Sequence, residues 1–251
     1  MKQYNVASLF AGVGGICLGF KNAKLDDKEF NLCFANEMDE YACETYRTNF
    51  NHSLIQGDIN KLLKPETCET ESEKEYYESQ RHILFEQKID VLNGGFPCQA
   101  FSIAGEQKGF EDERGNLFLS IVELINQMDK YSTKPRILFL ENVKNLLAHD
   151  KGRTFDFIIQ SIKDCGYPNV YYDVFNTENF GLAQKRNRVF IFATTEELPN
   201  FVFSSETIKD IFSNIAEKTS LLKQKNTHEV LEKNVDEKYY LSDVIKPTIL
   251  S

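Results

Sequence analysis

The sequence is short of the features that mark metal-binding, disulfide-bonded and membrane proteins. Its six cysteines include no CxxC pair, and the closest two, Cys33 and Cys43, are ten positions apart. This spacing argues against both a zinc site and a disulfide framework. The four histidines form no cluster, so we expect no metal site. No apolar run approaches the roughly 18 residues that a membrane span needs.

The sequence also lacks a recognisable signal segment and any excess of positive charge. It passes from its first five residues directly into an apolar strand, and we expect a protein of the reducing cytoplasm. The net charge of −9 argues against an extended phosphate-binding surface. However, glutamates crowded between positions 66 and 78 bias that total, and Lys185, Arg186 and Arg188 form a basic cluster elsewhere. The net charge therefore weakens the case for nucleic-acid binding but does not exclude it.

Short apolar runs alternate with longer helix-like stretches along the chain. The expected strands are Val6–Phe10, Leu32–Asn36, Leu54–Gln56, Ile89–Leu92, Ile137–Glu141, Val170–Phe175 and Arg188–Ala193. The expected helices are Gly14–Asn22, Glu40–Phe50, Leu117–Met128 and Thr154–Cys165. This alternation predicts an α/β fold with a mainly parallel sheet covered on both faces. The segment 176–187 resembles a loop, so we expect the last strand pair to run antiparallel, at least in part.

Two stretches fall outside this alternation. Glu66–Arg81 is rich in glutamate, and we expect a solvated helix or loop without a specific role. From Thr195 onward the apolar pattern weakens. At 251 residues the chain can bury one full core, or a core with a small appendage.

A glycine-rich turn follows the first strand and opens a helix, in the order Phe10-Ala11-Gly12-Val13-Gly14-Gly15. Glycines let a backbone approach a ligand closely. Glu37 ends the second strand, where a carboxylate can accept hydrogen bonds from ribose hydroxyls, and Asp58 ends the third, placed to bind an adenine amino group. The phosphate-binding pattern GxGxxG lacks its third glycine, which favours a cofactor without pyrophosphate. By itself the turn suits an NAD dehydrogenase or an S-adenosylmethionine-dependent methyltransferase.

The most informative segment is Gly94-Gly95-Phe96-Pro97-Cys98-Gln99-Ala100-Phe101-Ser102. Its cysteine follows a proline where an apolar strand runs out into a glycine-rich loop. Most structural cysteines lie inside periodic apolar elements, where they pack as small hydrophobic residues. Strand carboxyl ends are where open α/β sheets bind their ligands. We therefore expect the Cys98 thiol to project into a cleft.

Taken together, and in this order, these motifs resemble the cytosine-5 DNA methyltransferases of bacterial restriction–modification type. Glu141-Asn142-Val143 resembles the family's catalytic glutamate motif, and Gln184-Lys185-Arg186-Asn187-Arg188 its QxRxR element. The resemblance extends from Ser8 to about Ala193. It implies a Rossmann-like fold dependent on S-adenosylmethionine, with a mainly parallel seven-stranded sheet whose last strand is antiparallel.

The resemblance also implies three sets of site residues. The catalytic set is Cys98, Glu141, Arg186 and Arg188. The cofactor-binding set is Phe10, Ala11, Gly12, Gly14, Gly15, Glu37, Met38, Asp58, Ile59, Pro97 and Leu117. The set expected to contact double-stranded DNA is Gln99, Ser102, Lys108, Arg114 and Gln184.

The chemistry that the resemblance implies explains why these residue types are needed. A Cys98 thiolate would add to C6 of cytosine and make C5 nucleophilic enough to take the methyl group. Glu141 would bind ring N3, and Arg188 would hold the base O2. Arg186 would orient the loop or contact phosphate. These atoms cannot be reached in a stacked duplex, so the base must be flipped out.

The family continues with a target-recognition domain, for which the segment 196–251 is too short. We expect a cofactor-binding and catalytic domain at 1–195 and an extension at 196–251 leading toward a recognition domain outside the chain. Three explanations stay open: a fragment of a longer protein, one subunit of a split enzyme completed by a second polypeptide, or an inactive relic. Two other functions also stay open, a transfer-RNA cytosine-5 methyltransferase and a non-catalytic scaffold of the same fold.

Overall fold

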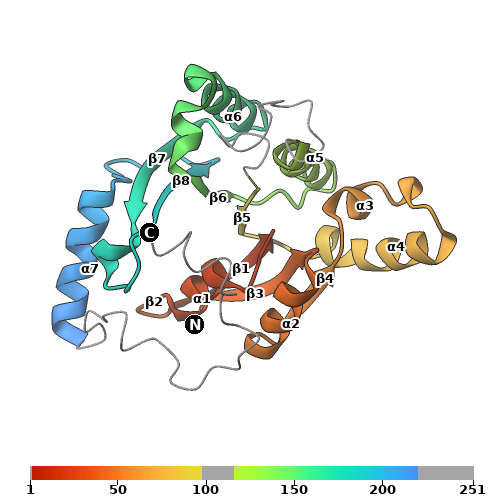
Figure 1. The fold of residues 1–251 in the computed structure, drawn as a ribbon, viewed down its shortest axis with the longest axis horizontal. Helices are drawn as coiled ribbons and strands as arrows, with labels where there is room; N and C mark the ends of the chain where they lie inside the picture. The colour runs from red at the N-terminus through yellow and green to blue at the C-terminus, as the bar shows by residue number, and fades with distance from the viewer. Residues whose placement is uncertain (1, 98–115, 220–251) are drawn as a thin grey trace, which may run out of the picture. The chain divides into compact units, whose positions relative to one another are not determined.

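The computed structural model describes residues 2–97 and 116–219 (Figure 1). The chain divides into two compact units. The first combines Met1–Phe175 with Asn187–Ile208, and the second combines Asn176–Arg186 with Lys209–Ser251. The sheet and the helices packed on it belong to the first unit.

One sheet organises the first unit. Its strands are β1 (Lys2–Leu9), β2 (Lys24–Leu25), β3 (Lys28–Glu37), β4 (Ser53–Gln56), β5 (Val91–Gly95), β6 (Ile137–Val143), β7 (Asn169–Asn176) and β8 (Asn187–Thr194). They lie in the order β2-β3-β1-β5-β6-β8-β7, with β4 paired to β3. All seven expected strands are present.

Strand direction confirms the expected fold class. β1 runs parallel to β3 and β5, β3 to β4, and β5 to β6, whereas β8 runs antiparallel to β6. The sheet has eight strands rather than the expected seven, because β2 pairs antiparallel with the start of β3. The chain reverses between them at Asp26, whose φ is 53°. Two residues are too few to show strand periodicity in a sequence.

The helices of the described residues are α1 (Gly15–Asn22), α2 (Glu40–Asn49), α3 (Ile59–Leu63), α4 (Glu71–Phe85), α5 (Asn116–Lys130), α6 (Arg153–Asp164) and α7 (Ser205–Thr219). Short 3-10 segments lie at Pro65–Thr67 and Thr177–Phe180, and a third, Lys144–Gly152, is interrupted by a kink at residues 149–151. The four expected helices are confirmed as α1, α2, α5 and α6, whereas α3 and α7 were not predicted. None of the described helices is long and apolar enough to cross a membrane.

Both faces of the sheet are covered. On one face, apolar side chains of β1, β5, β6 and β8 pack in a single core with side chains of α3 to α6. On the other, Ala35 of β3 packs with Cys17 of α1 and with Tyr46 and Phe50 of the α2 region. Covering both faces leaves the sheet's edges and strand ends for function.

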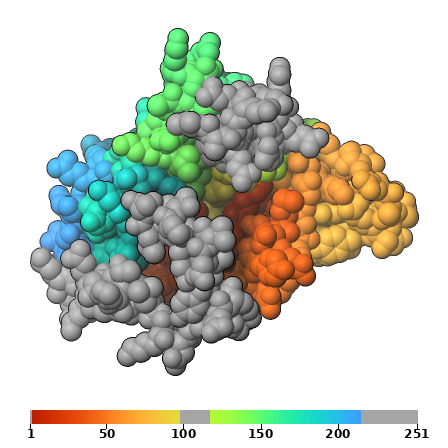
Figure 2. All heavy atoms as spheres, viewed as in Figure 1, coloured from red at the N-terminus to blue at the C-terminus, as the bar shows by residue number. Residues whose placement is uncertain are grey.

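The glutamate-rich segment is not the plain solvated surface that its composition predicts. It forms a short 3-10 turn and then α4, which Thr70 caps by accepting a hydrogen bond from Glu73 N at 3.2 Å. Tyr77 of α4 is only 5% exposed, and Leu84 and Phe85 are also buried. Helices α3 and α4 form the orange-to-yellow surface in Figure 2. The inner face of α4 is therefore part of the core.

Candidate active site

The predicted site residues that the structure describes in the first unit gather at one edge of the sheet, because they follow the carboxyl ends of neighbouring parallel strands. The glycine turn follows β1, Glu37 ends β3, and Asp58 follows β4. Pro97 follows β5, and Glu141 lies near the end of β6. In open α/β sheets this edge is where ligands bind.

The turn after β1 has an unusual backbone. Phe10, which is not a glycine, has a φ of 52°, and Gly12 and Gly14 have φ values of 54° and 93°. Such values are uncommon outside glycine and cluster at functional sites. A Cβ on Gly14 would lie 2.2 Å from the Phe50 ring, so packing as well as backbone conformation requires glycine there.

Glu37 joins the end of β3 to this turn. Its Oε2 accepts a hydrogen bond from Gly12 N at 2.8 Å, and its Oε1 accepts from Met38 N at 2.8 Å and Asp39 N at 2.9 Å. Three backbone donors therefore fix the direction of one carboxylate. Each carboxylate oxygen has two lone-pair sites, so Oε1 is fully used and Oε2 can accept one further hydrogen bond from a ligand.

The space beside this carboxylate suits a nucleoside. A Cβ built on Gly12 or Gly15 would meet no atom within 4 Å, so the turn borders open space. The Met38 side chain is exposed next to Glu37. Asp58 uses Oδ1 to accept from Asn60 N at 2.8 Å, while its Oδ2 accepts no hydrogen bond among the described residues. The residues present thus fit an adenosine group, with Glu37 at the ribose and Asp58 at the base.

Not every residue of the predicted cofactor set offers a side chain. Ile59 is 2% exposed and packs in the core, so only its backbone can face a ligand. Leu117 lies in the first turn of α5 and packs partly against the same core. Pro97 is half-buried just beyond β5.

Three members of the predicted catalytic set are described, and two of them, Glu141 and Arg188, lie in the first unit. Arg188 Nε lies 2.7 Å from Glu141 Oε1, and the two side chains are 20% and 19% exposed. Glu141 is opposite Gly95 in the parallel register of β5 and β6. A Cβ on Gly95 would lie 3.0 Å from Glu141 Oε2. The glycine therefore lets this carboxylate lie close to the strand that leads to Cys98.

Two buried asparagines, absent from the predicted set, hold the strand ends in register. Asn142 donates to Phe96 O at 3.0 Å and accepts from Val143 N at 2.8 Å. Asn93 accepts from the Ser8 hydroxyl at 2.9 Å and donates to Ala7 O at 3.0 Å. Buried amides are costly unless paired, and both are paired here. Asn93 thus connects β5 to β1, and Asn142 connects β6 to the residue that follows β5.

Comparison with known proteins shows the family to which the chain belongs. The C-5 cytosine-specific DNA methylase family matches residues 4–248. The chain belongs to this family. The match includes every strand end described above.

Curated members of the family are similar over most of this chain. Type II methyltransferase M.SsoII of Shigella sonnei is 36% identical over 243 residues, which is 97% of this chain and 54% of that protein. M.Bsp6I of Bacillus sp. (strain RFL6) is 40% identical over 217 residues, 83% of this chain and 60% of that protein. The chain thus spans between about half and two thirds of the length of these relatives.

A solved structure agrees on the fold. The S. pombe Dnmt2 methyltransferase superposes with a TM-score of 0.63 at 20% identity, covering 97% of this chain and 66% of that one. At this level of identity the likeness concerns the fold alone.

The other predicted site residues are not among those described in the first unit. Cys98, Gln99, Ser102, Lys108 and Arg114 fall outside the described residues. Gln184 and Arg186 belong to the second unit, where the Thr177 hydroxyl donates to Gln184 O and accepts from Arg186 N. Among the described residues, no group of three His, Cys, Asp or Glu side chains could hold a metal ion.

A polar network lies beneath the glycine turn. The Tyr46 hydroxyl is 3.1 Å from Cys17 Sγ and 2.8 Å from His52 Nε2. Burial lowers the pKa of His52, and the nearby Lys21 lowers it further. Burial also raises the pKa of Tyr46 above its usual value. These shifts favour a neutral phenol and a neutral imidazole under the helix that follows the turn.

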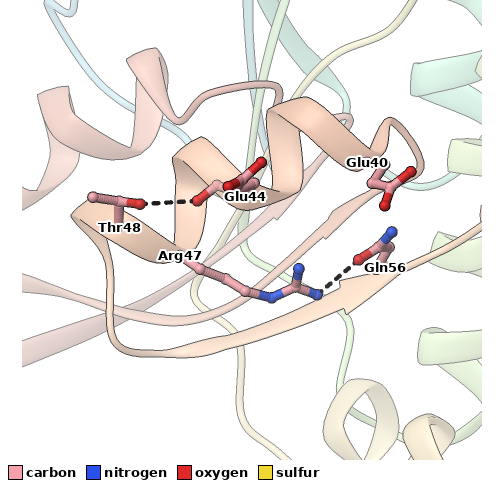
Figure 3. Close-up of a pocket in the computed structure, with 5 residues that line it drawn as sticks. All are labelled: Glu40, Glu44, Arg47, Thr48 and Gln56. Carbon is pink, nitrogen blue, oxygen red and sulfur yellow. Dashed lines mark hydrogen bonds between the residues drawn. The ribbon is translucent and has the colours of Figure 1, made fainter.

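A shallow pocket of about 440 Å³ lies between α2 and β4, and none of the predicted site residues lines it (Figure 3). Glu40, Glu44, Arg47, Thr48 and Gln56 line it. Arg47 donates to Gln56 Oε1 at 2.9 Å across the pocket. Gln56 directly precedes the Gly57–Asp58 turn, so this contact ties α2 to the strand that leads to Asp58.

Proposed function

We propose that this chain supplies the catalytic and cofactor-binding part of a DNA cytosine-5 methyltransferase that uses S-adenosylmethionine. The observation that carries the proposal is the Glu141–Arg188 pair, held beside the strand that leads to Pro97 and Cys98. A guanidinium can donate to O2 of a cytosine ring, and a glutamate carboxyl can donate to ring N3 when it is protonated. The Glu37-bound glycine turn lies at the same edge of the sheet.

The proposed reaction assigns one task to each residue. The Cys98 thiolate adds to C6, and the electron pair of the C5–C6 bond becomes available at C5. Glu141 holds a proton at ring N3, and Arg188 donates to the base O2. S-adenosylmethionine supplies the methyl group as an electrophilic sulfonium. Methyl transfer releases S-adenosylhomocysteine. The C5 proton then passes to solvent water, its electron pair re-forms the C5–C6 double bond, and the Cys98 thiolate leaves C6.

The proposed cofactor contacts follow the described geometry. Glu37 Oε2 accepts from a ribose hydroxyl, and Asp58 Oδ2 accepts from the adenine amino group. Met38 packs against the base, and the backbone from Phe10 to Gly15 borders the rest of the cofactor.

We propose that residues 1–195 carry this chemistry and that DNA sequence is read by a region additional to residues 1–251. The longer length of the similar Type II methyltransferases supports the second point. Such a region could be continuous with this chain or carried by a second polypeptide. Their names also support a role in restriction–modification, and a DNA substrate supports a cytoplasmic location.

The test is covalent trapping. When fluorine replaces the C5 hydrogen, elimination of the cysteine is blocked and the adduct with C6 persists. We would incubate the chain with S-adenosylmethionine and 5-fluorocytosine duplex DNA of mixed sequence, with and without the recognition region of a similar Type II enzyme. The wild type is expected to form an adduct that survives denaturing electrophoresis, whereas Cys98→Ser is not.

The same assay separates the remaining functions. Transfer RNA that contains 5-fluorocytosine is tested in parallel. An adduct with transfer RNA and none with DNA would favour a transfer-RNA methyltransferase. If the chain binds S-adenosylhomocysteine in calorimetry but forms an adduct with neither nucleic acid, a non-catalytic scaffold replaces the proposal.

A further inference from the structure

Two adjacent tyrosines of α4 hold the turn that carries Asp58. The Tyr76 hydroxyl donates to Gln56 O at 3.1 Å, and the Tyr77 hydroxyl accepts from Asp58 N at 2.9 Å. A Cβ on Gly57 would lie 2.2 Å from the Tyr77 oxygen, so this tyrosine packs directly on the glycine. Consecutive side chains of one helix thus bind the carbonyl before Gly57 and the amide after it.

The opposite side of the turn is held by the end of β3. Asn36 donates to Gly57 O at 2.9 Å, and Gly57 N donates to Glu37 O at 2.9 Å. Glycine has no side chain to restrict rotation of the peptide that follows it. Asn36 holds the carbonyl of the peptide between Gly57 and Asp58, and Tyr77 holds its amide, so the two contacts together fix the peptide plane and the start of the Asp58 side chain.

Helix α4 is itself fastened to the site. Lys61 Nζ lies 2.7 Å from Glu73 Oε1, which ties α3 to α4. Arg81 donates to Leu62 O at 3.0 Å and to Leu63 O at 2.6 Å, at the carboxyl end of α3. Tyr77 itself is held by packing, since its ring is buried in the core. The tyrosine thus has a rigid support from which to hold Asp58.

We propose that Tyr77 is a positioning residue for adenine recognition, which directs Asp58 Oδ2 at the exocyclic amino group of the cofactor. This inference rests on the proposed function, because it takes S-adenosylmethionine as the ligand. The inference goes further than the proposed function, because it gives α4, which contains most of the glutamate-rich segment, a role in selectivity toward adenine. Without the Tyr77 hydroxyl, Asp58 still caps α3 and Asn36 still binds Gly57 O, but the Asp58 amide loses its hydrogen bond and the carboxylate is held less firmly in direction.

The experiment compares two ligands that differ at the amino group. Tyr77→Phe keeps the ring on Gly57 and removes only the oxygen. Binding of S-adenosylhomocysteine and S-inosylhomocysteine to the 251-residue chain is measured by calorimetry. The variant is expected to bind the adenosyl ligand roughly three- to tenfold more weakly, which corresponds to one neutral hydrogen bond. Its affinity for the inosyl ligand should not fall.

Tyr131→Phe is the matched control. Tyr131 is 59% exposed, and its ring packs 5.0 Å from that of Phe85 at the other end of α4. It should leave both affinities unchanged. Equal weakening of both ligands by Tyr77→Phe would make the hydroxyl a general support of the fold and overturn the inference, as would unchanged adenosyl binding. If the wild type binds neither ligand, the proposed function fails, and this inference fails with it.

Discussion

Arg188 and Glu141 are paired across two antiparallel strands, with Arg188 Nε 2.7 Å from Glu141 Oε1. Arg188 lies opposite Val143 in the β6–β8 register, so the ion pair is a diagonal one. About four fifths of each side chain is shielded from solvent. The pair therefore fixes both groups at the sheet edge before any substrate arrives.

Breaking this pair should affect stability and activity differently. We expect Arg188→Met to lower the free energy of unfolding by about 1–3 kcal/mol, because Glu141 loses the partner of a partly buried charge. Adding Glu141→Gln should recover most of that loss, since no charge is then left behind. Methyl transfer should fall about a hundredfold in Arg188→Met and not recover in the double variant. Urea unfolding and single-turnover methylation measure the two effects, and strictly additive stability changes would contradict the coupling.

Replacing Glu37 by glutamine should weaken cofactor binding. The amide has one accepting oxygen instead of two, so it cannot satisfy Gly12 N on one side and Met38 N and Asp39 N on the other. Charge-assisted hydrogen bonds are worth about 1.5–3 kcal/mol each, so affinity for S-adenosylhomocysteine should fall at least about tenfold. Glu29→Gln makes the same change near the start of β3 and should have no effect. Equal affinity of Glu37→Gln and wild type in calorimetry would refute this role.

The Asn142 amide should affect turnover more than cofactor affinity. Asn142→Asp has nearly the same shape but cannot donate to Phe96 O, just before Pro97 and Cys98. We expect methyl transfer to fall at least about tenfold and unfolding free energy by about 1–3 kcal/mol. The dissociation constant of S-adenosylhomocysteine should change less than about twofold.

Asn49→Asp is the control for Asn142, because the exposed Asn49 amide also donates to a carbonyl, Thr45 O at 2.8 Å. It should leave turnover unchanged. A parallel loss of turnover and of cofactor affinity in Asn142→Asp would mean that this asparagine supports the whole sheet edge and not the cysteine strand in particular.

The sequence predicts the larger elements and the residues at their ends for a clear physical reason. Strands of a parallel sheet are buried on both faces, so they can be recognised in the sequence as continuous apolar runs. Parallel strands also bring their carboxyl ends to the same side of the sheet. Glu37 ends β3 and Glu141 lies near the end of β6, so both are predicted near the ligand. The ion pair between Glu141 and Arg188 is not predictable in this way, because it depends on the register of β6 and β8.

Tyr77 and Asn93 show why the rest could not be predicted. Tyr77 lies in a run dominated by glutamate, where composition suggests a solvated surface. Only helical spacing puts it on one face with Arg81 and Leu84. Asn93 interrupts an apolar strand, and its role appears only when its partner Ser8 is known. Both residues take their roles from tertiary contacts.

The buried His52 predicts a loss of stability on acidification. Its pKa in the folded chain lies below the ordinary value of about 6.5, because burial penalises the imidazolium and Lys21 adds repulsion. The unfolded chain therefore binds more protons at this residue between the folded pKa and about 6.5. By linkage, the free energy of unfolding should decrease as the pH falls through that window and level off below the folded pKa. Above about pH 6.5 the contribution of His52 should be constant.

His52→Gln isolates this contribution, since glutamine can share a hydrogen bond with the Tyr46 hydroxyl but does not titrate. Urea unfolding of wild type and variant at intervals from pH 8 to pH 5 gives the two profiles. The variant should lose less stability than wild type below about pH 6.5, and the difference between the profiles should be flat above it. Because Tyr46 and Phe50 pack under Gly14, the glycine turn should loosen together with this network. S-adenosylhomocysteine binding should therefore weaken on acidification more steeply in wild type than in the variant, and parallel profiles would show that His52 stays neutral over the whole range.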